Sequence, residues 1–172
     1  MSKSLSAMTH KEVINIAACW LSNRRTTTGL DAKIRCRIIL REPTNYLGAY
    51  GNENPDILGI WDSNNTVNIE AKVSRSDFFA DAKKEHGHPY GHYKLYACPS
   101  GLIKPEEIPE KWGLLYVGGN GGRLIVEPKY FDDAQEVGGI LANILLNAIS
   151  ANAITIEHLR RKGMWDGKGV IL

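Results

Sequence analysis

The chain has 172 residues, of which 43% are hydrophobic and 23% are charged. This length suits one domain with a buried core, and the composition excludes a disordered, fibrous or disulfide-stapled chain. The 21 lysines and arginines nearly balance the 19 acidic residues, so the formal net charge is +2. That total neither requires nor excludes nucleic acid as a partner, because the distribution of charge matters more than its sum.

Nothing in the sequence indicates a membrane protein. The first residues lack an apolar signal core, and no run approaches the roughly 18 apolar residues that a span needs. The three cysteines are far apart and lack metal-binding spacing, as expected for small buried side chains in a reducing cytoplasm. We therefore expect a cytoplasmic protein without a membrane partner. Its oligomeric state stays open, a dimer included.

Residues 1–8 are expected to form a flexible tail, after which Thr9 begins the first helix. Glu12 lies three residues further on, the spacing of a capping box, in which each side chain bonds the backbone N–H of the other residue. Apolar side chains then recur at helical spacing to about residue 23. Residues 34–40 alternate basic and apolar side chains and predict a strand, with Glu42 at its end.

The segment from residue 54 to residue 81 carries the strongest pattern in the chain. Residues 57–61 and 66–71 predict two strands, and the four polar residues between them are typical of a turn. Pairing as a hairpin would bring Asp56, before the first strand, close to Glu70 and Lys72 at the end of the second. Glu70 and Lys72 are two residues apart on a strand, so they share a face.

Two carboxylates and a lysine in this arrangement suit phosphodiester cleavage. Two hard oxygen donors can hold Mg²⁺ or Mn²⁺ and leave positions for water and phosphate. A neighbouring lysine can lower the pKa of the attacking water or stabilise the charge that grows on the phosphate.

Pro55-Asp56 followed by Glu70-Ala71-Lys72 resembles the motif of the PD-(D/E)XK nuclease superfamily. The resemblance includes the flanking strands and the following helix. A narrower similarity, to MmcB-type DNA-repair proteins, rests on Glu70-Ala71-Lys72 followed by Ser74-Arg75-Ser76-Asp77-Phe78 and Asp81-Ala82-Lys83.

This resemblance implies a metal-dependent nuclease acting on DNA, in repair, restriction or phage DNA processing. Asp56 and Glu70 would bind Mg²⁺ or Mn²⁺ with help from the carbonyl of Ala71, and Lys72 would orient the attacking water. Many members carry a further acid on the first helix, which makes Glu12 a candidate, although capping alone explains that residue. Glu42 is the second candidate, if its strand lies beside the hairpin.

A helix is expected from Ser74 to Lys84, capped by Ser74 or Ser76 and packed on the sheet through Phe78, Phe79 and Ala82. Asp77, Asp81 and Glu85 recur on one face, which we interpret as solvated. The residues expected to contact nucleic acid are Arg75, Lys83, Lys84 and, from the histidine- and glycine-rich loop that follows, His92.

The remaining pattern predicts a strand at 93–98, a helical turn at 105–107, strands at 112–117 and 123–127, a buried helix at 137–149, a basic helix at 154–162 and an apolar tail that docks back. The whole chain, 1–172, is thus expected to be a single α/β domain with a mixed sheet flanked by helices, like the restriction-endonuclease core. The alternatives are an inactive nucleic-acid-binding module on the same fold and an unrelated interaction protein.

Overall fold

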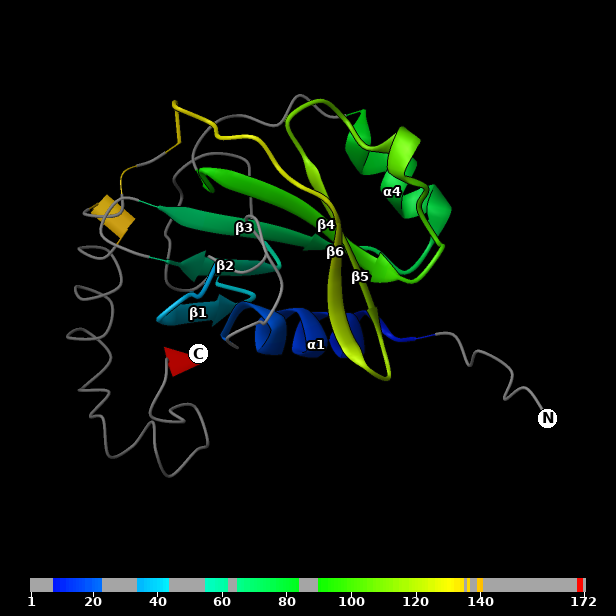
Figure 1. Cartoon of the computed structure of the whole chain (residues 1–172), viewed down its shortest axis with the longest axis horizontal. Helices are drawn as coiled ribbons and strands as arrows, with labels where there is room; N and C mark the ends of the chain where they lie inside the picture. Colours follow the sequence, from blue (N-terminus) through cyan, green and yellow to red (C-terminus); the bar gives the residue numbers. More distant parts are fainter. Residues whose placement is uncertain are drawn as a thin grey trace.

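In the computed structural model of the protein, seven strands form one sheet (Figure 1). The residues that the structure describes are 8–22, 34–43, 55–61, 65–83, 90–134, 136, 139–140 and 170–171. The strands are β1 (Ile38–Arg41), β2 (Ile57–Ile60), β3 (Thr66–Ala71), β4 (Tyr93–Pro99), β5 (Gly113–Gly118), β6 (Gly121–Val126) and β7 (Val170–Ile171).

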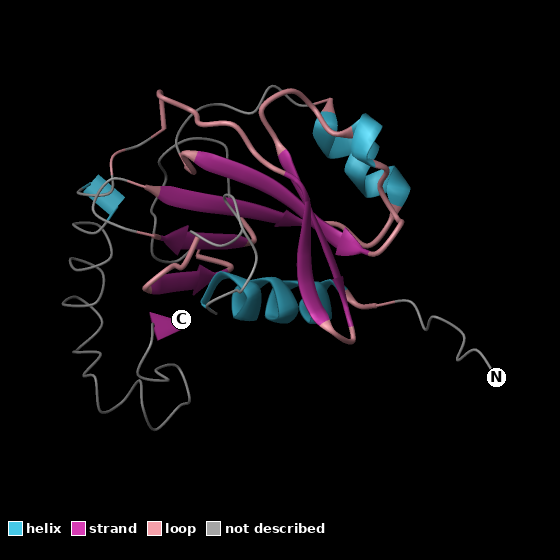
Figure 2. Ribbon diagram, viewed as in Figure 1, coloured by secondary structure: helices cyan, strands magenta, loops and turns pink. Residues whose placement is uncertain are grey.

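The sheet is mixed and runs in the order β6-β5-β4-β3-β2-β1-β7. The predicted hairpin is present, because β2 and β3 are antiparallel with Ile57 opposite Ile69. In contrast, β3 and β4 are parallel neighbours, which requires a crossover connection, and helix α4 (Arg75–Ala82) lies within it. The expected α/β class, with a mixed sheet flanked by helices, is confirmed (Figure 2).

Helix α1 (His10–Ser22) covers one face of the sheet. It has the predicted amphipathic spacing, and its apolar side packs against the odd-numbered side chains of β3 and β4. A Cβ at Gly59 of β2 would lie 2.5 Å from Cys36 Sγ and 3.2 Å from Leu21 Cδ1, so only glycine permits this close approach. The buried residues in this layer include Val13, Ile14, Ala17, Leu21, Val67, Ile69, Ala71, Leu95 and Ala97.

Helix α4 covers part of the opposite face (Figure 1). Ser74 caps it as predicted, accepting the Asp77 N–H at 3.2 Å. Phe78 is fully buried, with its ring edge-on to Tyr96 at a centroid separation of 5.1 Å, and Ala82 packs against the same cluster. The expectation for Phe79 was wrong, because that side chain is 40% exposed. Two aromatic residues in succession point to different sides of a helix, so only one of them reaches the sheet.

Other predicted elements have mixed outcomes. The helical turn expected at 105–107 is present as η1 (Pro105–Glu107), and the strand expected at 34–40 begins only at Ile38. The apolar tail docks back as predicted, because β7 pairs in parallel with β1. The two helices expected at 137–149 and 154–162 lie outside the described residues, apart from 139–140. Among the described helices, none is long and apolar enough to cross a membrane.

Candidate active site

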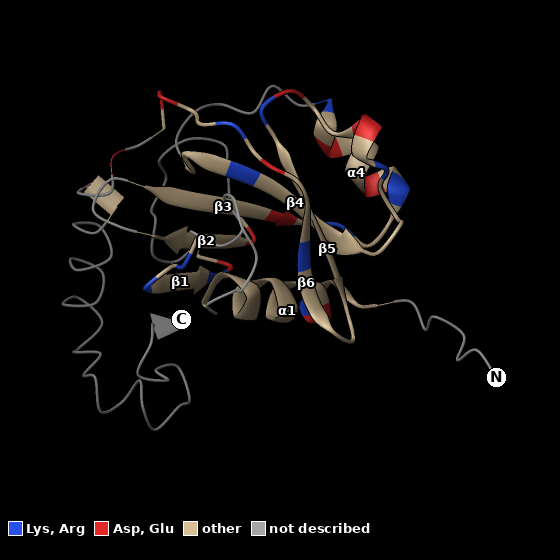
Figure 3. Cartoon of the chain, viewed as in Figure 1, with Lys and Arg blue, Asp and Glu red and all other residues tan. Residues whose placement is uncertain are grey.

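Polar side chains line the side of β3 and β4 that faces away from α1. Alternation along β3 turns Thr66, Asn68, Glu70 and Lys72 to this side, while Val67, Ile69 and Ala71 face the α1 layer. Most of this polar strip is buried, including Lys72, which is 6% exposed. The strands as a whole carry few charged residues (Figure 3). Burying polar side chains costs free energy of folding unless they are paired, so partners for this strip are expected nearby.

Asp56 lies where the sequence predicted it, at the end of three adjacent strands. Ile57 pairs with Arg41 on one side and with Ile69 on the other, so the next position sets Asp56 between Glu42 and Glu70. The Glu42 N–H donates to the Asp56 carbonyl at 2.8 Å. The Ala71 N–H donates to Asp56 Oδ2, also at 2.8 Å. The Pro-Asp and Glu-Ala-Lys halves of the motif are therefore hydrogen-bonded to each other.

Lys72 lies within a small group of charged and polar side chains. Its Nζ is 3.8 Å from Glu70 Oε2 and 3.3 Å from Asp81 Oδ2 of α4. The Tyr96 hydroxyl, on the neighbouring strand, donates to Asp81 Oδ2 at 3.2 Å. Asp81 is 6% exposed, so the prediction that it lies on a solvated face was wrong. Asp77, on the same predicted face, is exposed, whereas Asp81 is turned towards the lysine. Glu85 lies outside the described residues.

The first helix contributes a histidine to this region rather than an acid. His10 Nε2 lies 3.2 Å from Asp56 Oδ2, across 46 positions of sequence. Sequence analysis missed His10, although a signal for it exists. Val13, Ile14 and Ala17 are three, four and seven residues further on, and all are buried, so His10 extends the apolar stripe of α1 to the end of the sheet.

Glu12 forms the predicted capping box. Its Oε2 accepts the Thr9 N–H at 2.7 Å and the Thr9 hydroxyl at 2.8 Å, while the Glu12 N–H is 3.3 Å from Thr9 Oγ1. The backbone hydrogen bond from Thr9 is the main cause that lowers the pKa of Glu12 from its ordinary value. Of the two interpretations of Glu12, capping is the one that the contacts support.

Glu42 is exposed and adopts a left-handed backbone conformation, with φ at 47°. Such a conformation is uncommon for a residue other than glycine and often accompanies functional sites. The strand of Glu42 does lie beside the hairpin, as its candidacy as the auxiliary acid required. The register of the sheet and the Glu42 N–H bond to the Asp56 carbonyl therefore place Glu42 beside Asp56.

The basic residues expected to contact nucleic acid differ in how available they are. The Arg75 guanidinium pairs with both carboxylate oxygens of Glu107 and donates to the Leu102 carbonyl at 3.0 Å. A phosphate would have to compete with Glu107 for it. Lys83 is exposed at the C-cap of α4, and Lys84 lies outside the described residues.

His92 is not an exposed nucleic-acid contact, and that prediction was wrong. It is 5% exposed, and its ring stacks on Tyr130 with centroids 5.3 Å apart. Its Nδ1 lies 2.9 Å from the Thr66 hydroxyl, and the His92 N–H donates to the same hydroxyl at 3.2 Å. These bonds join the start of β3 to the start of β4. His92 therefore has a structural role, which depends on the pairing of two strands that are distant in sequence.

A divalent cation would find oxygen donors at Asp56 and Glu70. The contacts to Asp56 involve Oδ2, and within the described chain no hydrogen bond reaches Oδ1. Two carboxylates with a backbone carbonyl form the hard donor set that Mg²⁺ and Mn²⁺ prefer. The described residues contain no group of three or more histidine, cysteine or acidic residues arranged around a metal position.

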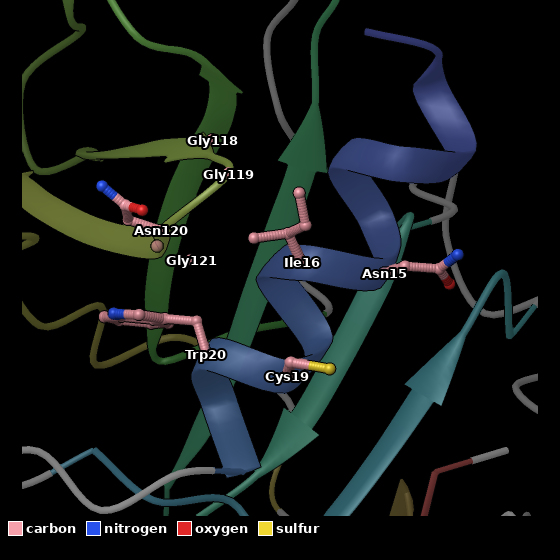
Figure 4. A pocket seen from close by; sticks show the side chains of 9 residues that line it. Asn15, Ile16, Cys19, Trp20, Gly118, Gly119, Asn120 and Gly121 are labelled. Atoms are coloured by element: carbon pink, nitrogen blue, oxygen red, sulfur yellow. The ribbon is translucent and has the colours of Figure 1, made fainter.

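A separate cleft of about 480 Å³ lies between α1 and the turn that joins β5 to β6 (Figure 4). The helix lines it with Asn15, Ile16, Cys19 and Trp20, and the turn lines it with residues 118–122. These residues are all uncharged, and none belongs to the Asp56–Lys72 region. The cleft therefore adds nothing to the candidate site.

Comparisons with known proteins establish the fold and leave the chemistry open. No family model and no curated protein matches the chain. A solved structure that is similar to it is the SPO1766 protein of unknown function from Silicibacter pomeroyi, with a TM-score of 0.51 and 20% identity. The match covers 76% of this chain and 82% of that one. At this identity the similarity indicates a shared fold only.

Proposed function

We propose that the protein is a metal-dependent nuclease that hydrolyses phosphodiester bonds in DNA, with Mg²⁺ or Mn²⁺ as its cofactor. The supporting observation is the 2.8 Å hydrogen bond from the Ala71 N–H to Asp56 Oδ2. It joins the two halves of a motif that are 15 residues apart in sequence. A chance Glu-x-Lys on a surface hairpin would not require a buried lysine or a carboxylate fixed across the strands.

In this proposal Asp56 and Glu70 hold the cation through carboxylate oxygens, helped by the Ala71 carbonyl. When bound, the cation supplies an activated water and neutralises charge on the phosphate. Lys72 orients that water or stabilises the negative charge that develops on the phosphate. Its ammonium is held 3.8 Å from Glu70 by a further contact with Asp81. A positively charged group fixed before the reaction stabilises a transition state without the cost of reorganisation.

The remaining features of the proposal concern the auxiliary acid and the substrate. Glu42 is the better candidate for the acid, because the Glu12 carboxylate is engaged by Thr9. Lys83 is the better candidate for a phosphate contact, because Arg75 is paired with Glu107. A cytoplasmic location, expected from the separated cysteines, belongs to the same proposal.

The experiment is a cleavage assay with supercoiled plasmid and labelled oligonucleotides, in Mg²⁺, in Mn²⁺ and with chelator. We expect cleavage by the unmodified protein with metal and none with chelator. Asp56→Asn and Glu70→Gln should remove most of it. Asp77→Asn, which changes an exposed acid on α4, is the matched control and should cut at the unmodified rate. Equal rates in all four proteins would overturn the proposal.

A non-hydrolytic nucleic-acid-binding module is the second candidate. It is favoured by one observation, namely that Lys72 Nζ is closer to Asp81 than to Glu70, at 3.3 Å against 3.8 Å. A lysine paired chiefly with the helix could serve packing rather than a reaction. Fluorescence anisotropy at fixed salt separates the two candidates. Binding of DNA without cleavage in either metal would select the binding module.

A further inference from the structure

The beginning of α1 meets the candidate site at one point. His10, the first residue of the helix, has its Nε2 3.2 Å from Asp56 Oδ2. The two side chains are 42% and 21% exposed, so the contact lies at the rim of the sheet rather than in the core. A surface contact of this kind adds little to stability. Its main consequence is therefore its effect on the orientation of the Asp56 carboxylate.

Both contacts to the Asp56 carboxylate fall on the same oxygen. Oδ2 accepts the Ala71 N–H at 2.8 Å and lies 3.2 Å from the imidazole, whereas no described residue donates to Oδ1. A carboxylate held by one hydrogen bond can still turn about its Cβ–Cγ bond. A second contact to the same oxygen, from a different element, restricts that rotation and leaves Oδ1 for a cation.

The helix holds the imidazole in place. Thr9 and Glu12 form the capping box that fixes the first turn of α1. The buried residues Val13 and Ile14, one turn further on, seat that side of the helix on the sheet. His10 is therefore carried by a rigid element, in contrast to the loops that usually carry mobile contacts. Glu12, two residues on, lies at a different angle around the helix and is occupied by Thr9.

We infer that His10 is a positioning residue for Asp56, whose imidazole donates through Nε2 to Oδ2 and so orients the carboxylate for the cation. This inference rests on the proposed function, because it assigns His10 a role at the same site. Partners that hydrogen-bond a ligating carboxylate commonly contribute about 10- to 100-fold to metal affinity. The role requires the tautomer with hydrogen on Nε2, which leaves Nδ1 as an acceptor.

The test measures Mn²⁺ binding directly, without DNA and without turnover. Electron paramagnetic resonance of free Mn²⁺ gives the dissociation constant, and isothermal titration calorimetry checks it. We expect His10→Ala to weaken binding about 10- to 100-fold. His10→Gln should retain most of the affinity, because its side-chain amide can donate to Oδ2. The control is Lys11→Ala, which removes an exposed side chain from the same turn and should leave affinity unchanged.

The outcomes separate this inference from the proposed function. An unmodified protein that binds no Mn²⁺ would overturn the proposed nuclease site, and the inference with it. Binding by the unmodified protein with equal affinity in His10→Ala would overturn the inference alone. Equal weakening in His10→Gln and His10→Ala would rule out a hydrogen-bonding role. Thermal melts of each variant report folding, and His10→Gln keeps the comparison informative if His10→Ala melts early.

Discussion

The ammonium of Lys72 lies 3.3 Å from the carboxylate of Asp81, which is on the helix that follows the strand of Lys72. Both residues are 6% exposed, and Tyr96 donates a further hydrogen bond to the same carboxylate oxygen. A buried ion pair of this kind serves the fold as well as any chemistry, because removing either member leaves an uncompensated charge in the interior.

Lys72→Ala should therefore lower both activity and stability. We expect cleavage to fall by about 10²- to 10³-fold and the free energy of unfolding to fall by about 3–5 kcal/mol, the usual cost of breaking a buried pair. The loss of stability is expected because Asp81 is the buried partner of Lys72. Plasmid cleavage and urea unfolding measure the two effects.

A double variant separates the two roles. In Lys72→Met with Asp81→Asn, both charges are removed and the new side-chain amide keeps an acceptor for the Tyr96 hydroxyl, so stability should recover in part while cleavage stays low. If Lys72→Ala cuts as fast as the unmodified protein, its role in the reaction is wrong. An unchanged urea midpoint would contradict the buried pair.

The two phenylalanines of α4 should respond differently to truncation. Phe78→Ala should cost about 3–5 kcal/mol of unfolding free energy, because the ring is fully buried against Tyr96. Phe79→Ala is the matched control, since that ring is 40% exposed and lies 5.0 Å from the Arg75 guanidinium. We expect a loss below about 1 kcal/mol there, as for most surface changes. Similar losses of unfolding free energy in both variants would mean that α4 does not face the sheet with the side that carries Phe78.

The elements that the sequence predicted well are those with local patterns. A short apolar run, a polar turn and an alternating strand predicted the β2–β3 hairpin, and the Thr9–Glu12 spacing predicted the start of α1, because these signals lie within a few residues. The juxtaposition of Asp56 with Glu70 followed from the hairpin alone. These parts of the site needed no knowledge of how the helices pack.

The parts that could not be predicted depend on contacts between distant segments. Asp81 has the spacing of a solvated helix face, and only the docking of α4 over β4 and β5 turns it towards Lys72. His92 sits in a glycine-rich loop, and only the parallel pairing of β3 with β4 buries it against Thr66. To predict that His10 reaches Asp56, one would need to know which side of α1 faces the sheet and where α1 crosses it.

The Arg75–Glu107 pair should make stability depend on pH under acidic conditions. Hydrogen bonding from the Arg75 side chain, followed by that from the Lys104 backbone, lowers the pKa of Glu107 from 4.5 to about 2. A carboxyl with a depressed pKa in the folded state contributes stability above its unfolded pKa. That contribution is lost as the pH falls from about 4.5 to about 2.

Thermal melts across this acidic range compare the unmodified protein with Glu107→Gln and with Glu106→Gln, an exposed neighbour. The melting temperature of the unmodified protein and of Glu106→Gln should fall more steeply with decreasing pH than that of Glu107→Gln. Parallel curves for all three proteins would show that the pair does not link α4 to η1 in solution.

The last prediction distinguishes the two acids that were candidates for assisting the metal. Glu42 has a φ of 47° and donates its N–H to the Asp56 carbonyl. The left-handed conformation costs roughly 1–2 kcal/mol for residues other than glycine, and glycine itself loses about 0.5–1 kcal/mol in chain entropy. Glu42→Gly should thus be neutral or slightly stabilising.

If the Glu42 carboxylate assists the reaction, Glu42→Gly and Glu42→Gln should both slow cleavage, by roughly 10²-fold for a group that handles a proton. Their unfolding midpoints should stay close to that of the unmodified protein. Glu12→Ala should do the reverse, lowering the melting temperature through loss of the cap on α1 while leaving the cleavage rate unchanged. Cleavage in Mg²⁺ and urea unfolding of all three variants test this. If Glu12→Ala cuts slowly while Glu42→Gln cuts at the unmodified rate, the auxiliary acid is Glu12 on the first helix.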